Sequence, residues 1–294
     1  MFHQDKFKVK SNHNIYNSDG TIDIEQQGKL PLVYNEQRKS MTPMGAVRVI
    51  KERNNSNVFL SMPRYIPVNN ALTPEKDVVS MDPGVRTFMT TYDTNGFCSE
   101  WGEGDMKRVF ALCLYLDKMI GRLHGSLMVN KHGKKARSKR RNLRQAIERL
   151  RSKIKNKINE VHKKMSTWLC KTYKVILIPK FNSKAMSKKA NRKIHRKTVR
   201  GMLCWAHYRF RQRLINKSML FKDCKVIECD EAYTSKTCGY CGTINYKLGS
   251  SKVFHCKHKD CTKKLDKSDR DIHAARNILL RYLSRNKIMF RQTT

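Results

Sequence analysis

The chain has 294 residues, 39% of them hydrophobic, so it is long and apolar enough for one sizeable core plus a small appended module. Lys and Arg total 62 against 24 Asp and Glu, and because this formal charge of +38 repels itself unless a polyanion neutralises it, nucleic acid is the expected partner. No apolar run approaches the roughly 20 residues that span a bilayer, and the polar N-terminus lacks a signal-peptide pattern, so we expect no membrane contact and a reducing intracellular location, nuclear or cytoplasmic.

Short strands are predicted in the first part of the chain. Residues 44–68 alternate between polar and β-branched side chains, which indicates short strands. A strand is predicted at 77–82, a second at 86–92, and a third at 97–101 after a hairpin turn at Asn95-Gly96. Three strands joined this tightly predict an antiparallel meander.

Helical patterns dominate the middle of the chain. From about 104 to 173 apolar residues recur every three or four positions, and between Leu143 and Trp168 they form one stripe along a long basic helix. The cationic run 132–141 is predicted as the loop before that helix. We therefore expect 104–173 to be a helical insertion between strands.

The remaining segments alternate between strand and helix. Their predicted elements are a buried parallel strand at 175–178, basic helices at 184–220, a strand at 224–229 and a terminal helix at 268–283. A meander followed by helix, strand, helix, strand and helix is the succession of an RNase H-like fold. We therefore predict an α/β protein with an RNase H-like (RuvC) mixed sheet, long basic helical insertions and an inserted zinc ribbon.

The strongest local signal is a set of four cysteines. Cys238 and Cys241 are followed by Cys256 and Cys261, and two close pairs on hairpin turns can place four thiolates around Zn²⁺. The second pair is spaced by four residues, so His258 is a possible substitute ligand. Four protein ligands leave no open coordination position, so we expect this zinc to be structural.

Two carboxylates stand out at the ends of predicted elements. Asp82 ends the first strand of the meander, and Asp271 lies at the entry to the terminal helix. Each has a plain structural interpretation, Asp82 as a turn residue and Asp271, like Asp266 and Asp269, as an acid favoured by the helix dipole. In an RNase H-type core, however, the first strand and last helix bring such carboxylates together around two divalent ions about 4 Å apart. One ion would activate water while the other stabilises the leaving 3′ oxygen, so the pair predicts Mg²⁺-dependent cleavage.

Three segments resemble the TnpB-like proteins of transposable elements. The sequence DPGVRTF at 82–88 resembles their first RuvC motif, YTSKTCGYCG at 233–242 their zinc-ribbon entry, and DRDIHAARNI at 269–278 their third motif. The order, the spacing and the position of the ribbon match from about Leu30 to the C-terminus. The resemblance implies a transposon-associated DNA endonuclease, guided by RNA as members of that family are and similar to the compact type V CRISPR effectors.

The chain departs from this family at the second catalytic acid. The usual glutamate follows the middle strand, where this chain has Ile178-Pro179-Lys180-Phe181, and proline cannot ligate a metal. The relatives known as Fanzor take the acid from the next strand, which points by resemblance to Glu231. Adjacent parallel strands lie about 4.8 Å apart and their carboxyl ends share one sheet edge, so this glutamate can reach the same ions. Glu228 and Asp230 remain rivals.

The resemblance also suggests domain boundaries. We expect a partial wedge-like β segment at 1–76, a RuvC core at 77–232, a target-binding zinc ribbon at 233–262, and the third motif with the terminal helix at 263–294. His273 stands where the family generally has Asn. Little more than 80 residues precede Asp82, fewer than in guide-binding relatives, so an inactive nucleic-acid-binding relic of a transposon is the alternative.

Basic residues cluster in two stretches that are predicted to contact nucleic-acid backbone. The alternatives are solvated helix faces or a nuclear-import signal. Nearby, Trp205, Tyr208 and Phe210 could stack on bases, although their helical spacing favours the core. The predicted backbone contacts are Lys134, Lys135, Arg137, Lys139, Arg140, Arg141, Lys188, Lys189, Arg192, Lys193, Arg196, Lys197 and Arg200.

Overall fold

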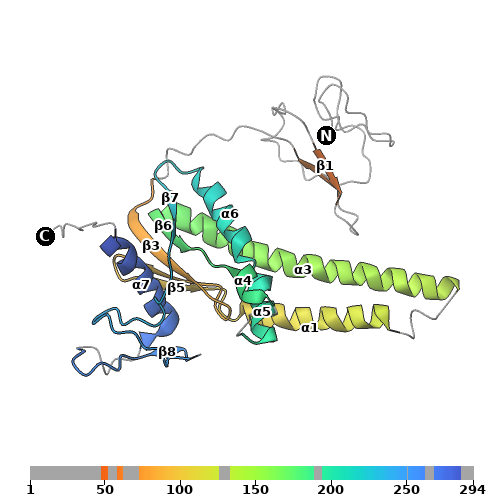
Figure 1. Cartoon of the computed structure of the whole chain (residues 1–294). Coiled ribbons are helices and arrows are strands. Elements are labelled where there is room, and N and C mark those ends of the chain that lie inside the picture. The colour runs from red at the N-terminus through yellow and green to blue at the C-terminus, as the bar shows by residue number, and fades with distance from the viewer. Residues whose placement is uncertain are drawn as a thin grey trace, which may run out of the picture. The chain divides into compact units, whose positions relative to one another are not determined.

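The computed structural model in Figure 1 describes residues 48–51, 58–61, 73–125, 133–188, 194–249, 251–261 and 268–285. The chain divides into two compact units, one of residues 1–67 with 141–149 and the other of residues 68–140 with 150–294. In the first unit, β1 (Arg48–Lys51) pairs antiparallel with β2 (Val58–Ser61), as the alternating pattern predicted. All the candidate site residues discussed below lie in the second unit, except Arg141.

A five-stranded mixed sheet forms the centre of the second unit. Its strands are β3 (Lys76–Pro83), β4 (Met89–Asp93), β5 (Cys98–Trp101), β6 (Tyr173–Pro179) and β7 (Lys225–Cys229), in the order β5-β4-β3-β6-β7. The first three strands are antiparallel, and β6 lies parallel between β3 and β7. The predicted meander and the two parallel strands are therefore confirmed.

A tight turn joins β3 to β4. We predicted that the second strand would begin at Arg86, but it begins at Met89, because the chain first turns between Gly84 and Phe88, whose backbone groups are hydrogen-bonded at 3.2 Å. A Cβ atom at Gly84 would lie 2.5 Å from the carbonyl oxygen of Thr87, so only glycine fits here. This turn ends β3 directly after Asp82.

Helices cover both faces of the sheet (Figure 1). On one face, α7 (Arg270–Arg285) packs against β3 and β4. The core on the other face contains side chains from α1 (Asp105–His124), α3 (Lys134–Thr172), α5 (Arg196–Trp205) and α6 (His207–Ser218). A short helix, α4 (Ser183–Ser187), precedes α5.

Because side chains alternate along a strand, successive residues of the sheet pack against the helices on opposite faces. In β3, Val79 and Met81 face the core with α1, α3 and α6, whereas Val78 and Ser80 face α7. The interior strand β6 is apolar on both faces along its buried part, Ile176–Pro179, as parallel strands between two helical layers usually are. Because successive side chains of a strand point to opposite faces, Asp82 shares the α7 face with Val78 and Ser80.

Two expectations about local structure are wrong. The cationic run 132–141 was predicted as a loop, but α3 begins at Lys134 and includes the rest of the run. Lys, Arg and Ala favour helix, and no helix breaker follows Gly133. The terminal helix was predicted from Ser268, but Ser268–Asp269 form a short strand, β9, paired with β8 (Val253–Phe254). That pairing connects the cysteine module to the start of α7.

An aromatic cluster surrounds Phe88 in the core. Its ring contacts His162, Trp205, His207 and Phe210, with ring centroids 4.8 to 5.1 Å apart. Trp205 and Phe210 are fully buried, which confirms the core interpretation for both. Tyr208, by contrast, is 63% exposed and remains accessible to a ligand.

The two histidines of this cluster predict acid sensitivity. Nε2 of His162 donates to the Trp205 carbonyl oxygen, Nε2 of His207 donates to that of Gly84, and neither Nδ1 has a partner. Burial lowers the pKa of His162 to about 4 and that of His207 to about 3. The unfolded chain therefore takes up more protons than the folded chain once the pH falls below about 6.5, the pKa of a free histidine.

We expect the free energy of unfolding to fall as the pH drops from about 6.5 to about 4, by at most roughly 3 kcal/mol for each histidine. Urea unfolding at a series of pH values measures this slope, and NMR of the histidine rings reports their protonation. Ring signals from both residues that titrate near pH 6.5 in the folded protein would contradict the prediction.

Candidate metal and catalytic site

Asp82 lies at the carboxyl end of the central strand β3 and is partly buried. Burial raises the pKa of its carboxyl group well above the usual value, and the negative charges of Asp271 and Glu231 raise it further. Arg270 acts in the opposite direction and lowers it. The structure therefore brings Asp271 and Glu231 close enough to Asp82 for their charges to act on its carboxyl group, although the three acids are far apart in sequence.

A buried hydrogen bond fixes β3 against α7. The Ser80 hydroxyl donates to the carbonyl oxygen of Ala275 at 2.7 Å and also lies 3.0 Å from that of Tyr92. Ser80 is two residues before Asp82 on the same face of the strand, and Ala275 is one helical turn after Asp271. The hydrogen bond from Ser80 to Ala275 therefore helps to fix the position of Asp82 relative to Asp271.

Asp271 occupies the first turn of α7. The Asp269 carboxylate accepts hydrogen bonds from the backbone N–H groups of Asp271 (2.8 Å) and Ile272 (3.3 Å), so Asp269 caps the helix. The structural interpretation is thus confirmed for Asp269, whereas Asp266 lies outside the described residues. The guanidinium of Arg270 lies 3.5 Å from the Asp271 carboxylate, whose side chain is only 13% exposed.

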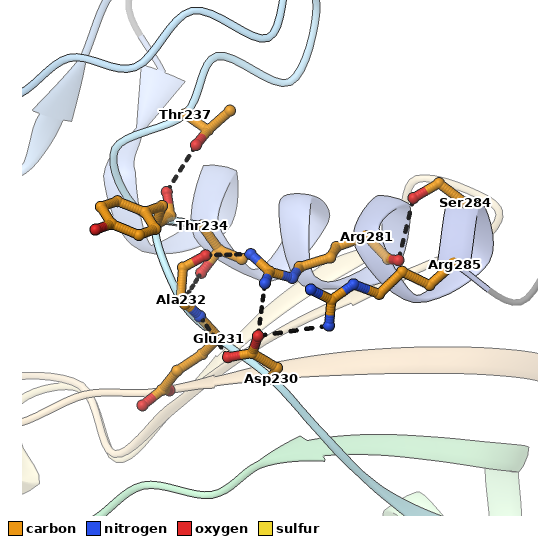
Figure 2. A network of polar contacts seen from close by, with 9 residues as sticks. Asp230, Glu231, Ala232, Thr234, Thr237, Arg281, Ser284 and Arg285 are labelled. Atoms are coloured by element: carbon orange, nitrogen blue, oxygen red, sulfur yellow. Dashed lines mark hydrogen bonds and ion pairs between the residues drawn. The ribbon is translucent and has the colours of Figure 1, made fainter.

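Glu231 lies in the loop that follows β7, two residues after Cys229. Within the strand, Ile227 and Cys229 pack on the α7 side of the sheet. Burial raises the pKa of the Glu231 carboxyl group, and the charge of Asp230 contributes. Figure 2 shows the Glu231 side chain directed away from Asp230.

The rival acids have other partners. Glu228 lies between Ile227 and Cys229 in β7, so its side chain points to the opposite face of the sheet from theirs. Its carboxylate forms ion pairs with Arg211 at 3.2 Å and Lys180 at 3.5 Å. Asp230 forms ion pairs with Arg281 at 2.5 Å and Arg285 at 3.5 Å (Figure 2). Glu228 and Asp230, the alternatives for the third acid, are thus each paired with two cations. Glu231, by contrast, is among the acids whose charge acts on Asp82.

The donor set of Asp82, Glu231 and Asp271 fits a hard divalent cation. Carboxylate oxygens are the ligands that Mg²⁺ prefers, and a cation bound here would offset the repulsion that Asp271 and Glu231 exert on the partly buried Asp82. The three carboxylates are not gathered as tightly as the cysteines described next, which are the one tight cluster of potential metal ligands found among the described residues.

The four predicted cysteines converge. The sulfur atoms of Cys238, Cys241, Cys256 and Cys261 all lie within 4.8 Å of one another. His258 is not part of this group, but its backbone N–H donates to the sulfur of Cys256 at 3.4 Å. Four sulfur atoms at this spacing can bind one zinc ion tetrahedrally.

The cysteine module packs closely on α7. A Cβ atom at Gly239 would lie 2.4 Å from side-chain atoms of both Arg276 and Asn277, so the loop between Cys238 and Cys241 requires glycine there. The ring of His273 stacks on Phe254 with centroids 4.1 Å apart. His273 thus joins the module to the helix that carries Asp271, which explains how a histidine is accommodated at this position.

The predicted nucleic-acid contacts have different surroundings. Lys197 is exposed and lies over the Phe110 ring, whereas Arg200 pairs with Asp117 and so joins α5 to α1. This pairing was not apparent from the sequence and makes Arg200 a weaker candidate. The helix α3 carries Lys135, Arg137, Lys139, Arg140 and Arg141, together with the backbone of Lys134. Two further predicted contacts, Lys188 and Arg196, are exposed. Outside the described residues lie Lys189, Arg192 and Lys193.

An open pocket of about 700 Å³ lies beside the candidate site, along the free edge of β7. Its lining includes three acids, Glu228, Asp230 and Glu231, and three basic side chains, Lys180, Arg281 and Arg285. The positive charges of this lining are therefore already paired with acids of the same pocket.

The fold and the site together define a mixed α/β protein with three acids near one sheet edge beside a four-cysteine module. Two family models match the chain. OrfB_IS605, described as "Probable transposase", matches residues 61–190, and the Cas12f1-like TNB domain matches residues 207–278.

Curated relatives come from large viruses. A protein named as a transposase in Paramecium bursaria Chlorella virus 1 is 34% identical over 77% of this chain and 48% of its own length. A TnpB-like protein of Acanthamoeba polyphaga mimivirus is 30% identical over 75% of this chain and 40% of its own length. The chain belongs to the TnpB-like family of transposon proteins, and it spans less than half the length of these relatives.

The similar solved structures are distant. The cryo-EM structure of a CRISPR-Cas12f ternary complex has a TM-score of 0.48 and 20% identity, over 79% of this chain and 44% of that one. A Cas12f1–sgRNA–target DNA complex has a TM-score of 0.41 and 18% identity, over 75% and 41%. No helix within the described ranges is both long and apolar enough to cross a membrane.

Proposed function

We propose that this chain is the catalytic part of a divalent-metal-dependent DNA endonuclease with an RNase H-like (RuvC) core, acting in the mobility of a transposable element. The observation that carries the proposal is the placement of Asp82, partly buried at the end of the central strand and under the combined negative charge of Glu231 and Asp271. Like charges gathered in a low-dielectric site are unfavourable without a cation, and such arrangements are typical of functional sites.

In this proposal Asp82, Glu231 and Asp271 are the ligands of two Mg²⁺ ions. When bound, these ions supply activation of the attacking water and stabilisation of the leaving 3′ oxygen of a phosphodiester. The protein's own contribution is positional: Ser80 ties β3 to α7, and Asp269 caps the helix so that Asp271 is held in its first turn.

The four cysteines complete the proposal as a structural zinc ribbon. Tetrahedral ligation by four thiolates leaves no position for a substrate, so zinc would hold the ribbon's shape against α7 rather than take part in cleavage. Thiolate ligation requires reduced cysteines, which fits the nucleus or cytoplasm of a cell.

An RNA guide is a further part of the proposed function. It is supported by the family, and the net charge of +38 favours a polyanionic partner of this kind. The proposed contacts with nucleic-acid backbone are the basic residues of α3, those of the segment before α5, and Arg196, Lys197 and Arg200 of α5 itself. The segment 1–76 is the proposed partial wedge.

Sequencing the RNA that accompanies the full chain, purified from its native expression context, tests this proposal. We expect one abundant, discrete RNA species, and cleavage of DNA matching that RNA in Mg²⁺ but not in EDTA. Random RNA fragments without DNA cleavage would contradict the proposal and favour a protein that only binds nucleic acid.

A further inference from the structure

The loop that carries Glu231 lies beyond the ladder of the sheet. The pairing of β6 with β7 ends at Pro179 and Cys229, so no strand hydrogen bond holds the backbone of Glu231. A metal ligand on an unsupported loop would have to be ordered each time metal binds, at a cost in conformational entropy. Other contacts must therefore fix this loop if Glu231 is to act with Asp82 and Asp271.

Asp230 anchors the start of the loop to α7. Its carboxylate accepts from Arg281 at 2.5 Å and from Arg285 at 3.5 Å, and its other oxygen accepts from the backbone N–H of Ala232 at 2.9 Å (Figure 2). The second terminal nitrogen of Arg281 donates to the carbonyl oxygen of Ala232. One arginine thus holds the residues on both sides of Glu231.

The same helix holds the rest of the loop. The amide nitrogen of Asn277 donates to the carbonyl oxygens of Thr234 at 2.8 Å and Thr237 at 2.6 Å. Nε2 of His273 lies 2.9 Å from the Thr237 oxygen, to which it can only donate. The Thr234 hydroxyl in turn donates to the carbonyl oxygen of Glu231 itself at 2.9 Å.

These helix residues form one regular stripe, which we call the clamp: His273, Asn277, Arg281 and Arg285. They are four residues apart, so they share one face of α7. As the helix advances from His273 to Arg285, its contacts move back along the loop from Thr237 to Asp230, so loop and helix run antiparallel. The clamp therefore fixes the loop 230–237 along its whole length.

We propose that Arg281 and Arg285, acting through Asp230 within this clamp, are positioning residues that hold Glu231 in place relative to Asp82 and Asp271. This inference rests on the proposed function, because it assigns a role in metal binding to residues that do not touch the metal. Since α7 carries both Asp271 and the clamp, a single rigid helix positions two of the three acids. Asp230 is then an anchor and is not itself the third ligand.

The test compares Arg281→Ala, Arg281→Lys and Asp230→Ala with the wild-type full chain. The matched control is Lys174→Ala, which removes the ion pair with Asp77 from the opposite end of the same sheet. The readouts are amide hydrogen exchange in the loop 230–237, Mn²⁺ affinity by electron paramagnetic resonance, and the kcat and KM of DNA cleavage. Circular dichroism verifies that each variant is folded.

We expect Arg281→Ala and Asp230→Ala to accelerate exchange in the loop and to weaken Mn²⁺ binding by about 10- to 100-fold, the usual effect of losing a residue that orients a metal ligand. The value of kcat should fall similarly with little change in KM. Arg281→Lys should recover part of this loss. A double variant that combines Arg281→Ala with Asp230→Ala should be no worse than the poorer of the two single variants, since the two residues act as one unit. Lys174→Ala should behave as wild type.

Unchanged exchange in folded Arg281→Ala would overturn the clamp. Faster exchange with Mn²⁺ affinity within twofold of wild type would overturn its positioning role. A wild-type chain that binds no Mn²⁺ would contradict the proposed function, and the exchange measurement would still decide whether the clamp exists.

Discussion

Replacing Asp82 with asparagine is expected to slow Mg²⁺-dependent DNA cleavage by about 1,000-fold or more, because losing a metal ligand removes several kcal/mol of charge stabilisation from the transition state. Glu231→Gln and Asp271→Asn should have effects of similar size. Single-turnover cleavage at saturating protein measures the chemical step, and fluorescence anisotropy without divalent metal measures DNA binding, which should remain within a few-fold of wild type.

Glu228→Gln is the matched control for these three substitutions. Glu228 lies three residues before Glu231, within β7, and its carboxylate pairs with Arg211 and Lys180. Its substitution should leave the rate of cleavage within a few-fold of wild type. If cleavage survived Glu231→Gln but was lost in Glu228→Gln, the assignment of the third ligand would be wrong.

The same Asp82→Asn substitution should stabilise the metal-free protein. The pKa of Asp82 is raised on folding, so its ionised form opposes folding, increasingly so as the pH rises above the pKa of a free aspartate. Asparagine removes that charge, and each kcal/mol gained raises the melting temperature by about 2–4 °C in a protein of this size. Mg²⁺ should raise the melting temperature of the wild type more than that of the variant. A less stable variant would argue against like-charge repulsion at this site.

Removing zinc is expected to have the second large effect. Structural zinc contributes roughly 10–16 kcal/mol of apparent binding energy to small cysteine modules, so stripping it should unfold the ribbon. Cys238→Ser and Cys256→Ser should each lose one zinc ion per chain by elemental analysis. Amide exchange should become fast across 233–261 while the five-stranded sheet remains protected.

Cys98→Ser provides the control, since Cys98 is an exposed thiol on β5, outside the cysteine module. It should retain full zinc and normal exchange. Cleavage should also fall when zinc is lost, because Thr237 and Phe254 of the cysteine module contact His273 of α7, the helix that carries Asp271. An ordered ribbon in a protein shown to contain no metal would contradict the prediction.

Much of this site could be predicted because its signals are local. The cysteine spacing, the acid at the end of an apolar strand and the acid at a helix start each occupy a few residues. Choosing Glu231 over Glu228 and Asp230 rested on resemblance. Its structural reason is the set of contacts between α7 and the loop after β7, where Arg281 bonds to Asp230 and Ala232 on either side of Glu231, and these are known only once the fold is formed.

Other features depend on contacts between distant segments. The hydrogen bond from Ser80 to Ala275 joins residues 195 positions apart, and no local pattern encodes it. The four-residue spacing of the clamp was visible in the sequence, but its partner is a loop with no regular pattern of its own. The cationic run 132–141 was predicted as a loop, whereas its helix propensity places it in α3 from Lys134 onward.

The most direct test of a shared metal site is a crystal structure of the chain with Mn²⁺ and a non-cleavable DNA, using anomalous scattering to locate the metal. We expect Mn²⁺ ligated jointly by carboxylate oxygens of Asp82, Glu231 and Asp271, with reduced occupancy in Asp82→Asn. Manganese found elsewhere, or a Glu231 side chain turned to solvent while Asp82 and Asp271 hold the metal alone, would contradict the proposed site.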